Sequence, residues 1–157
     1  MNDNSTTASS DQIGHRKQYA TFFVDGMYFG IDVLRVQEVL RAQEMTRVPL
    51  APPVIEGLIN LRGQIVTAID MRRRLKLPPR DTDTPATNVV VQSEGGAVSL
   101  LVDEIGDVVE VSQSCYELPP VNMPSAQRAL VDGIYKLDGA LLLVLNTDRT
   151  LKTQSEA

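Results

Sequence analysis

A stretch of fifteen residues occurs twice in this chain, and the repeat limits the accessible folds more than any other feature of the sequence. Residues 56–70 read EGLINLRGQIVTAID, and residues 132–146 read DGIYKLDGALLLVLN, aligned without a gap. The copies share their glycines and the apolar character of the positions on both sides of a short polar interruption. An internal repeat of this kind predicts a duplicated small unit.

Each copy predicts a strand, a tight turn, a second strand and a short helix. Glycine supplies the positive φ of a tight hairpin, so we expect strands at about 56–62 and 64–69, joined at Arg62-Gly63. Asp70 and its counterpart Asn146 then suit the N-cap of a helix, since their side chains accept hydrogen bonds from unpaired amides.

The two copies differ most at the turn. Asn60 and Arg62 of the first copy correspond to Lys136 and Asp138 of the second. A structural repeat needs the glycines and the apolar faces, but it does not need the arginine. Arg62, with Asn60 beside it, is therefore our first candidate for partner binding.

The remaining chain predicts further short strands. We expect hairpins at 18–31 and 88–102, a helical turn after Asp32 followed by a strand through Leu40, a strand at 103–111, and a long loop at 118–128. Many short strands with frequent turn signals are typical of small barrels. The predicted fold is mainly β, with two SH3-like five-stranded β-barrel subdomains packed together and short helices.

We expect three regions along the chain. Residues 1–16 are polar and predict a disordered tail, residues 17–152 form the ordered domain, and residues 153–157 form a frayed end. The domain divides into approximate halves at 17–80 and 86–152. Neither half is large enough to be comfortably stable alone, so we expect a shared interface, and strands can cross between the halves.

The composition argues against nucleic acid and membrane partners. The net charge is −5 and aromatic residues make up only 4% of the chain, so neither a basic footprint nor a stacking platform is expected. We interpret the basic run 72–76 as a solvated helix face. The longest apolar run, residues 140–145, is far shorter than the roughly 20 residues that span a bilayer. We expect a cytoplasmic protein without direct membrane insertion.

No catalytic or metal-binding pattern is evident. His15 is the only histidine and lies in the predicted tail. Cys115 is the only cysteine and is expected to be a small buried or half-buried thiol without a catalytic role. Asp103 and Glu104 are adjacent in a predicted strand, so their carboxylates would point to opposite faces. We therefore predict a protein that is not an enzyme and needs no cofactor or metal, with an enzyme using Asp103 or Cys115 as a weaker alternative.

Glu38 and Arg62 are the charged residues set most deeply in apolar sequence. Such residues are usually paired or lie at an exposed edge. One interpretation is a structural ion pair, and the other is a charged rim around an apolar patch that receives a partner helix. The two interpretations are compatible. The predicted patch consists of Val33, Val36, Leu40 and Leu58.

Several segments together resemble the CheW family of chemotaxis coupling proteins. They are residues 28–38 (YFGIDVLRVQE), 55–63 (IEGLINLRG), Ile69-Asp70, Val102-Asp103, Val108-Val109 and Gly133. The resemblance covers roughly residues 17–152. It implies two SH3-like barrels, no catalysis, and a scaffold adaptor that couples the cytoplasmic hairpin tips of chemoreceptors to a CheA-type histidine kinase in chemosensory signal transduction. It also implies recruitment to membrane-associated receptor arrays.

The resemblance implies receptor contacts at Val36, Glu38, Gly57 and Arg62, with Val33 near them. We add Leu58 from the predicted patch and Asn60 from the turn. Kinase contacts of the family involve barrel edges and loops, which points to a corresponding loop here. Its candidate residues are Glu117, Leu118, Val121 and Asn122. The alternative function is a small β-barrel module that binds a small molecule or RNA, although the acidic charge and scarce aromatic residues argue against RNA.

Overall fold

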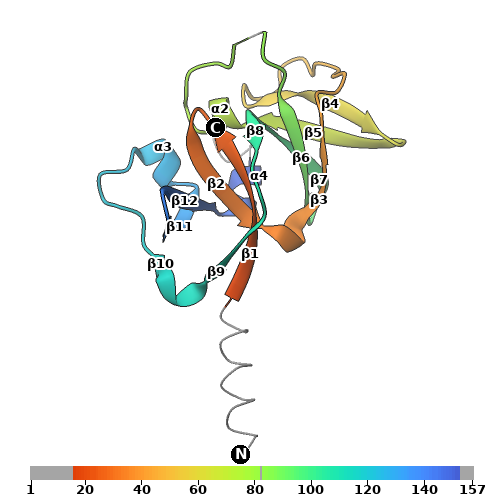
Figure 1. The fold of residues 1–157 in the computed structure, drawn as a ribbon. Helices are drawn as coiled ribbons and strands as arrows, with labels where there is room; N and C mark the ends of the chain where they lie inside the picture. The colour runs from red at the N-terminus through yellow and green to blue at the C-terminus, as the bar shows by residue number, and fades with distance from the viewer. Residues whose placement is uncertain (1–15, 82, 153–157) are drawn as a thin grey trace, which may run out of the picture.

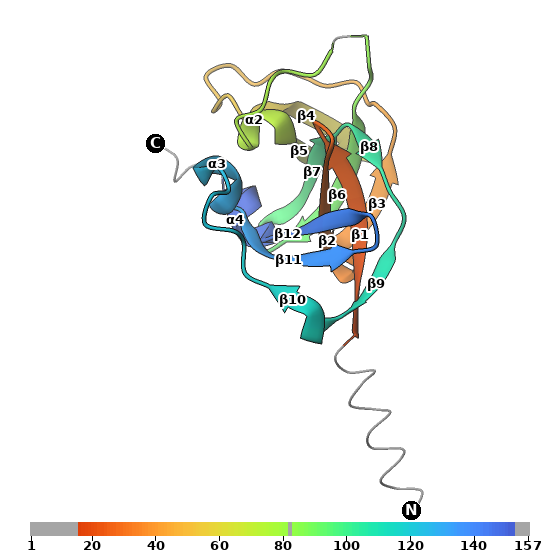
Figure 2. The same cartoon turned by 60° about the vertical axis from the view of Figure 1, so that its left-hand side comes forward.

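Two β-sheets linked by short helices make up the protein (Figures 1 and 2). The structure is a computed structural model that describes residues 16–81 and 83–152. The predicted tail at 1–15, with His15, and the predicted frayed end at 153–157 lie outside the described residues. Arg16, which we assigned to the tail, begins the first strand.

The first sheet has seven strands in the order β10-β11-β12-β2-β1-β8, and β9 also pairs with β1. Neighbouring strands are antiparallel except for β12 and β2, which run parallel. The strands are β1 (Arg16–Val24), β2 (Met27–Asp32), β8 (Glu104–Ile105), β9 (Val109–Ser112), β10 (Tyr116–Glu117), β11 (Val131–Leu137) and β12 (Ala140–Leu145).

The second sheet has five strands in the order β3-β6-β7-β5-β4, with β5 and β7 parallel and the other pairs antiparallel. Its strands are β3 (Val36–Leu40), β4 (Ile55–Leu61), β5 (Gln64–Asp70), β6 (Thr87–Ser93) and β7 (Gly96–Val102). The helices of the described chain are η1 (Val33–Arg35), α2 (Met71–Arg74), η2 (Gln113–Cys115), α3 (Ser125–Arg128) and α4 (Thr147–Leu151).

Each sheet combines strands from both predicted halves of the chain, 17–80 and 86–152. β1 and β2 join the late strands β8 to β12, whereas β3, β4 and β5 join β6 and β7. Figures 1 and 2 show β3 to β7 gathered towards one end of the molecule and β9 to β12 towards the other. The chain crosses between the sheets at η1, where the Asp32 carboxylate accepts a hydrogen bond from the Leu34 amide at 3.0 Å, as a cap does.

The predicted fold class is confirmed, since the chain is mainly β with two sheets and short helices. The first sheet has seven strands rather than the expected five. The segment predicted as one strand at 103–111 is interrupted into β8 and β9, and β10 adds at the opposite edge. Both sheets form open strand orders among the described residues, so closure into barrels is not found.

The predicted unit of strand, turn, strand and helix is present in both copies of the repeat. β4, β5 and α2 form the first copy, and β11, β12 and α4 form the second. Asp70 accepts a hydrogen bond from the Arg72 amide at 3.0 Å, and Asn146 accepts one from the Arg149 amide at 2.8 Å. The two caps therefore begin the helices as their side-chain chemistry predicts.

The glycine at the start of each copy is required by close packing. Gly57 and Gly133 lie at matching irregularities of their hairpin registers. A Cβ atom on Gly57 would lie 2.8 Å from the backbone oxygen of Thr46, and one on Gly133 would lie 2.2 Å from Cζ of Tyr116. Each glycine thus lets the preceding segment cross over its strand, which explains why both copies carry one.

We predict that Gly57→Ala lowers the free energy of unfolding by about 1–3 kcal/mol, and that Gly133→Ala lowers it less. The neighbour of Gly57 is backbone, which cannot move without shifting a strand partner. The neighbour of Gly133 is the end of the Tyr116 side chain, which is 38% exposed and can rotate. Urea denaturation of both variants checks this order, and an equal or larger loss for Gly133→Ala would contradict it.

The core lies between the sheets and within each of them. The main cluster combines residues of both sheets with Met71 and Leu75 after β5. A second cluster around Tyr135 and Leu142 lies within the first sheet, and two smaller clusters lie within the second. Two local expectations were wrong, because the loop at 118–128 contains α3, and Cys115 at the end of η2 is exposed.

Candidate partner-binding site

An ion pair connects the two edges of the second sheet at the turn of the first repeat copy. β3 and β4 lie at opposite ends of the strand order, and Arg62 follows β4 directly. Arg62 Nη2 donates a hydrogen bond to Glu38 Oε2 on β3. The sheet therefore curls until its two edge strands are close enough for these side chains to meet, and the predicted ion pair is confirmed.

The turn that carries Arg62 is held by its own side chains. Arg62 and Gly63 both have positive φ, of 54° and 87°, and Asn60 Oδ1 accepts a hydrogen bond from the Gly63 amide at 2.9 Å. In the second copy Gly139 has a positive φ, whereas Asp138 does not. Asn60 thus fixes a turn conformation that is particular to the first copy and aims Arg62 at β3.

The ion pair is open to solvent on the arginine side. The Arg62 side chain is 69% exposed, whereas that of Glu38 is 21% exposed. The hydrogen bond from Arg62 lowers the pKa of the Glu38 carboxyl, and the same contact raises the pKa of Arg62. Both groups therefore stay charged at neutral pH, and the guanidinium presents its remaining donors to the outside.

Two other predicted receptor-contact residues lie further back along β4, against the chain that follows β3. Gly57 is buried against Thr46, and Leu58 exchanges two backbone hydrogen bonds with Thr46, at 2.9 and 2.8 Å. Both residues connect β4 to the chain that follows β3. A role of Gly57 in partner binding would therefore be indirect, through the position of this crossing segment.

The predicted apolar patch is not an exposed surface. Its members are Val33, Val36, Leu40 and Leu58, all of which are half-buried. Val36 packs against the main core and Leu40 against the cluster around Leu61. The exposed apolar side chains near the ion pair in sequence are instead Val39 and Ile65, at 46% and 60% exposure.

The predicted kinase-contact segment follows β10 of the first sheet. Leu118 and Val121 are 79% and 83% exposed, and Asn122 is exposed as well. The backbone oxygen of Val121 accepts a hydrogen bond from Arg128 at 3.0 Å, which ties the segment to α3. Glu117 forms an exposed ion pair with Lys136 at 3.6 Å.

An apolar groove of about 950 Å³ runs beside this segment. It lies between the tips of the β1–β2 and β11–β12 hairpins and is closed on another side by the loop before α3. Its apolar lining includes Phe23, Met27, Met123 and Leu141, and Asn122 belongs to its edge. The groove and the exposed Leu118 and Val121 together offer an apolar docking surface on the first sheet.

The basic run 72–76 is not a solvated helix face, and this expectation was wrong. Arg72 donates to Asp103 at 3.0 Å from Nε and 2.6 Å from Nη2, and its third nitrogen donates to the Pro78 oxygen at 2.9 Å. Arg74 donates to carbonyls at the end of α4, among them those of Arg149 and Thr150. These arginines connect parts of the fold that are distant in sequence.

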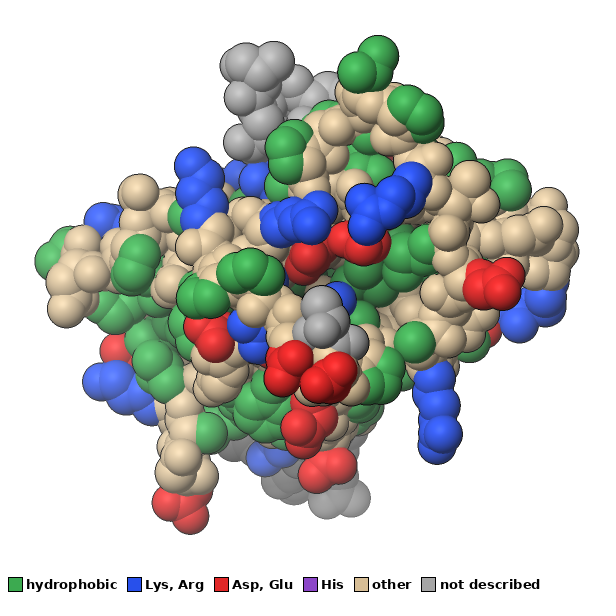
Figure 3. Space-filling model, turned by 90° about the horizontal axis from the view of Figure 1, so that it is seen from above, with side chains coloured by type: hydrophobic (Ala, Val, Ile, Leu, Met, Phe, Trp, Pro, Cys, Tyr) green, Lys and Arg blue, Asp and Glu red, His purple; other side chains and the backbone are tan. Residues whose placement is uncertain are grey.

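Charged side chains of both signs are present on the face seen from above in Figure 3. Lysine and arginine side chains lie among aspartate and glutamate side chains, and no uniform basic area covers this face. In the described part of the chain, no set of three or more His, Cys, Asp or Glu side chains is grouped to hold a metal ion. None of the described helices has the length and apolar character to cross a membrane.

Comparison with known proteins agrees with the two-sheet fold described above. The model of the CheW-like domain matches residues 18–155 of this chain. The chain belongs to the CheW-like domain family.

Relatives of this CheW-like chain match it over most of its length. The chemotaxis protein CheW of Bacillus subtilis is 31% identical over 134 residues, which is 85% of this chain and 86% of that protein. The chemotaxis protein CheW of Treponema pallidum is 25% identical over 87% of this chain and 83% of its own length. The scaffolding protein TtCheW of Thermoanaerobacter tengcongensis superposes with a TM-score of 0.75 at 29% identity, covering 83% of this chain and 88% of that one.

The CheW-like fold brings Glu38, Asn60 and Arg62 together, and it places residues 117–122 at the end of β10 of the other sheet and in the loop that follows. The sequence interpretation missed Val39 and Ile65. The alternation of side chains along a strand could have predicted that Val39 is exposed. If Val36 and Leu40 point inward on β3, Val39 must point outward.

Proposed function

We propose that this chain is a non-catalytic scaffold that couples chemoreceptors to a CheA-type histidine kinase in chemotaxis. The observation that carries the proposal is the match of the CheW-like domain over residues 18–155, together with the shared fold at a TM-score of 0.75. The proposed place of action is the cytoplasm, at the tips of membrane-associated receptor arrays.

The receptor site in this proposal is the turn around Arg62. A helical hairpin tip lies against β3 and the β4–β5 turn, and it contacts the exposed Val39 and Ile65 with its apolar stripe. The Arg62 guanidinium, held by Glu38, sets the register of the helix through a charge-assisted hydrogen bond. Val33, Val36, Gly57 and Leu58 support this surface from beneath.

The kinase site in this proposal is the segment from Glu117 to Asn122 with the adjoining apolar groove. Leu118 and Val121 insert between apolar side chains of the kinase, and Glu117 and Asn122 form the polar rim. The two sites belong to different sheets, so that both partners can be held at once. Each contact is small, and an array of such contacts gains strength by multivalency.

Reconstitution with a CheA-type kinase and a receptor cytoplasmic fragment tests the proposal. The chain is expected to capture each partner alone and to bring the kinase into the receptor complex when all three are mixed. Size-exclusion chromatography with light scattering measures the three complexes. A folded chain that binds neither partner would refute the coupling function.

We predict that Leu118→Ser combined with Val121→Ser weakens kinase binding roughly tenfold or more and leaves receptor binding unchanged. Both side chains are almost fully exposed, so the fold is expected to tolerate the change. Leu50→Ser is the matched control, since Leu50 is fully exposed in the connector before β4. Equal affinity of the double variant and the control for the kinase would remove this segment from the interface.

A further inference from the structure

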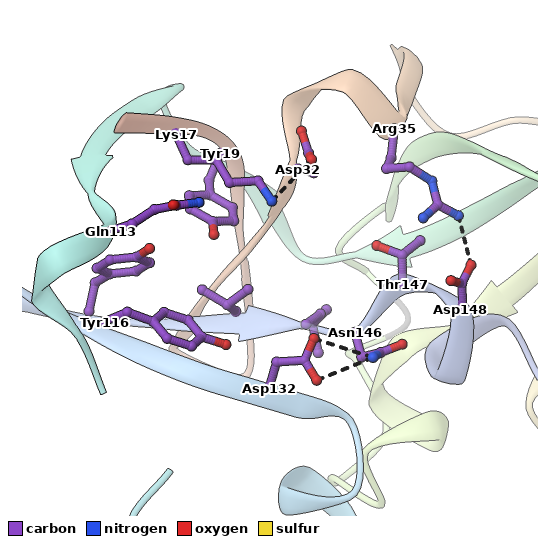
Figure 4. Close-up of a pocket in the computed structure, with 13 residues that line it drawn as sticks. Lys17, Tyr19, Asp32, Arg35, Gln113, Tyr116, Asp132, Asn146, Thr147 and Asp148 are labelled. Carbon is purple, nitrogen blue, oxygen red and sulfur yellow. Dashed lines mark hydrogen bonds and ion pairs between the residues drawn. The ribbon is translucent and has the colours of Figure 1, made fainter. Parts of the chain in front are cut away.

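A cavity of about 490 Å³ opens beside the first sheet, next to β10, which leads into the proposed kinase segment (Figure 4). Its walls come from β1, β2, β10 and β11 and from the junction of β12 with α4. Figure 4 shows the rings of Tyr19 and Tyr116 on one side, and the carboxylates of Asp132 and Asp148 on the other.

The second sheet contains a position equivalent to this cavity. The residue pairing between neighbouring strands identifies it. Val144 of β12 lies opposite Gly30 of β2, as Ala68 of β5 lies opposite Ser99 of β7. Two residues further along β2 and β7 are Asp32 and Leu101, which therefore occupy matching positions.

The other strands give the same correspondence. Tyr19 faces Asp32 as Asn88 faces Leu101, so that Lys17 and Ala86, two residues earlier, also match. On the other side of the cavity, Glu117 faces Ile134 as Thr46 faces Leu58, so that the preceding Tyr116 and Met45 match. Tyr135 matches Ile59 through the repeat itself.

In the second sheet these matching positions form a packed apolar cluster. Ile59, Ala68 and Leu101 are buried there, with Met45 and Ala86 packed against them. In the first sheet the corresponding residues are Tyr135, Val144, Asp32, Tyr116 and Lys17, and all five line the cavity. Aliphatic side chains are therefore sufficient to pack the fold at this position. The tyrosines, the carboxylate and the ammonium group are not required for folding.

The chemistry of the cavity suits a cation. The Tyr135 ring lies 5.7 Å from that of Tyr19 and 5.2 Å from that of Tyr116, measured between ring centroids. Burial is the largest cause that raises the pKa of Tyr19 and that of Tyr116, so both phenols stay neutral. Neutral aromatic faces attract ammonium and guanidinium groups.

The charged lining of the cavity has an excess of carboxylates. The lining contains three aspartates, Asp32, Asp132 and Asp148. It contains two cationic side chains, Lys17 and Arg35. Arg35 pairs with Asp148 at 3.0 Å, and Asp132 is held from behind by Arg149 at 2.6 Å. The Asp132 carboxylate also accepts from Asn146 Nδ2 at 3.2 Å, which orients it.

Lys17 shows how a cation is held in this cavity. Its ammonium nitrogen lies 3.3 Å from Asp32 Oδ2 and 5.8 Å from the centroid of the Tyr19 ring. The group thus combines a carboxylate contact with an aromatic face, which is the arrangement expected of a bound organic cation. Lys17 is 37% exposed and sits on a flexible stem, so an incoming group can displace it.

We propose that this cavity binds an organic cation, namely a primary ammonium or guanidinium group on a short chain. The aromatic side of the cavity contacts the face of the group, and the aspartates accept its hydrogen bonds. The cation is supplied either by a free small molecule or by a lysine or arginine side chain of a protein partner.

Titration of the whole chain with arginine amide, followed by calorimetry and by NMR shifts of the tyrosine rings, tests the proposal. Binding is expected for arginine amide and for cadaverine, and not for the anion N-acetylglutamate. Lys17→Ala is expected to bind arginine amide more tightly, because it uncovers Asp32 and the Tyr19 ring. Absence of binding in both the wild type and Lys17→Ala, or equal binding of the anion, would overturn the proposal.

Two variants with a control locate the binding. Tyr116→Met installs the residue type that the second sheet has at this place, and it is expected to weaken arginine amide binding roughly threefold to thirtyfold. Asp132→Asn is expected to weaken binding as well, whereas Asp138→Asn, an exposed aspartate outside the cavity, is expected to leave it unchanged. Equal affinities in all three variants would place the binding elsewhere and overturn the proposal.

Competition then distinguishes the two sources of the cation. If a partner supplies the side chain, saturating arginine amide weakens binding of the kinase or receptor fragment, and Tyr116→Met weakens it too. If a free molecule is the ligand, partner binding is unaffected by both changes. Both results support the cavity as a cation site, and they differ only in what fills it.

Discussion

Replacing Asp103 with alanine is expected to lower the free energy of unfolding by about 2–4 kcal/mol. The Asp103 carboxylate accepts hydrogen bonds from the Arg72 guanidinium and from the Asp25 amide, the latter at 2.7 Å. Only 18% of the Asp103 side chain and 15% of the Arg72 side chain are exposed. The variant therefore leaves a poorly hydrated arginine without its partner carboxylate, which costs more than the loss of an exposed ion pair.

Urea denaturation at neutral pH measures this loss. Glu104→Ala is the matched control, because Glu104 is the neighbouring carboxylate and is exposed. The control is expected to change the free energy of unfolding by less than about 0.5 kcal/mol. If Asp103→Ala were as stable as Glu104→Ala, the contact with Arg72 would contribute nothing to the fold.

The same contact predicts a dependence on pH. Burial acts to raise the pKa of Asp103, but hydrogen bonds from Arg72 and from the Asp25 amide outweigh it and lower the pKa. A lowered folded-state pKa gives stability that is present above the unfolded pKa, about 3.9, and is lost as the pH falls through the folded value. The stability difference between wild type and Asp103→Ala is therefore expected to be constant near neutral pH and to shrink below about pH 4.

The sequence predicted those parts of the fold that depend on near neighbours. The turns at Asp25-Gly26 and Arg62-Gly63 and the caps at Asp32 and Asp70 were all placed correctly. In each of these features the residue and the backbone groups that it satisfies lie within a few positions of one another. A local pattern is sufficient information for such features.

Contacts between distant segments were not visible in the same way. Arg72 and Arg74 look solvated in the sequence because their partners are distant: Arg72 binds a carboxylate in the segment after β7, and Arg74 binds carbonyls at the end of α4. The pairing of β3 with β6 likewise joins the two halves of the chain. Such partners are set by tertiary structure, which a local pattern of charge or hydrophobicity does not encode.

The candidate site shows the same division. Glu38 and Arg62 were identified because charges in apolar sequence require a partner, and the structure pairs them. Val36 and Leu40 of the predicted patch are half-buried and pack against core clusters, whereas Val39 faces solvent. Residues 36–40 alternate along β3, and which of the two faces is buried is decided by the pairing of β3 with β6.

Arg62→Ala is expected to leave the fold intact and to weaken binding of the receptor fragment roughly tenfold or more. The Arg62 side chain is exposed, and exposed ion pairs contribute little stability. Alanine and arginine also share the Cβ atom that the positive φ at this position must accommodate, so the turn is not strained further. Calorimetric titration with a receptor cytoplasmic fragment measures the loss, and circular dichroism checks the fold.

Asp138→Ala is the matched control, because Asp138 occupies the corresponding turn position in the second copy of the repeat. It removes an exposed charge from the hairpin turn of the other copy, and receptor binding is expected to be unchanged. If Arg62→Ala and Asp138→Ala bound the receptor fragment equally well, the Arg62 turn would be a structural variant of the repeat and not a partner-binding site.

A charge exchange separates the two roles of the ion pair. Arg62→Glu combined with Glu38→Arg restores the pair between β3 and the turn but reverses which side presents the cation. If the pair acts only by holding the sheet edges together, the double variant binds the receptor fragment as the wild type does. If the Arg62 guanidinium itself contacts the receptor, the double variant binds as poorly as Arg62→Ala. We expect the second result, because the guanidinium is 69% exposed while the Glu38 carboxylate is 21% exposed and largely covered.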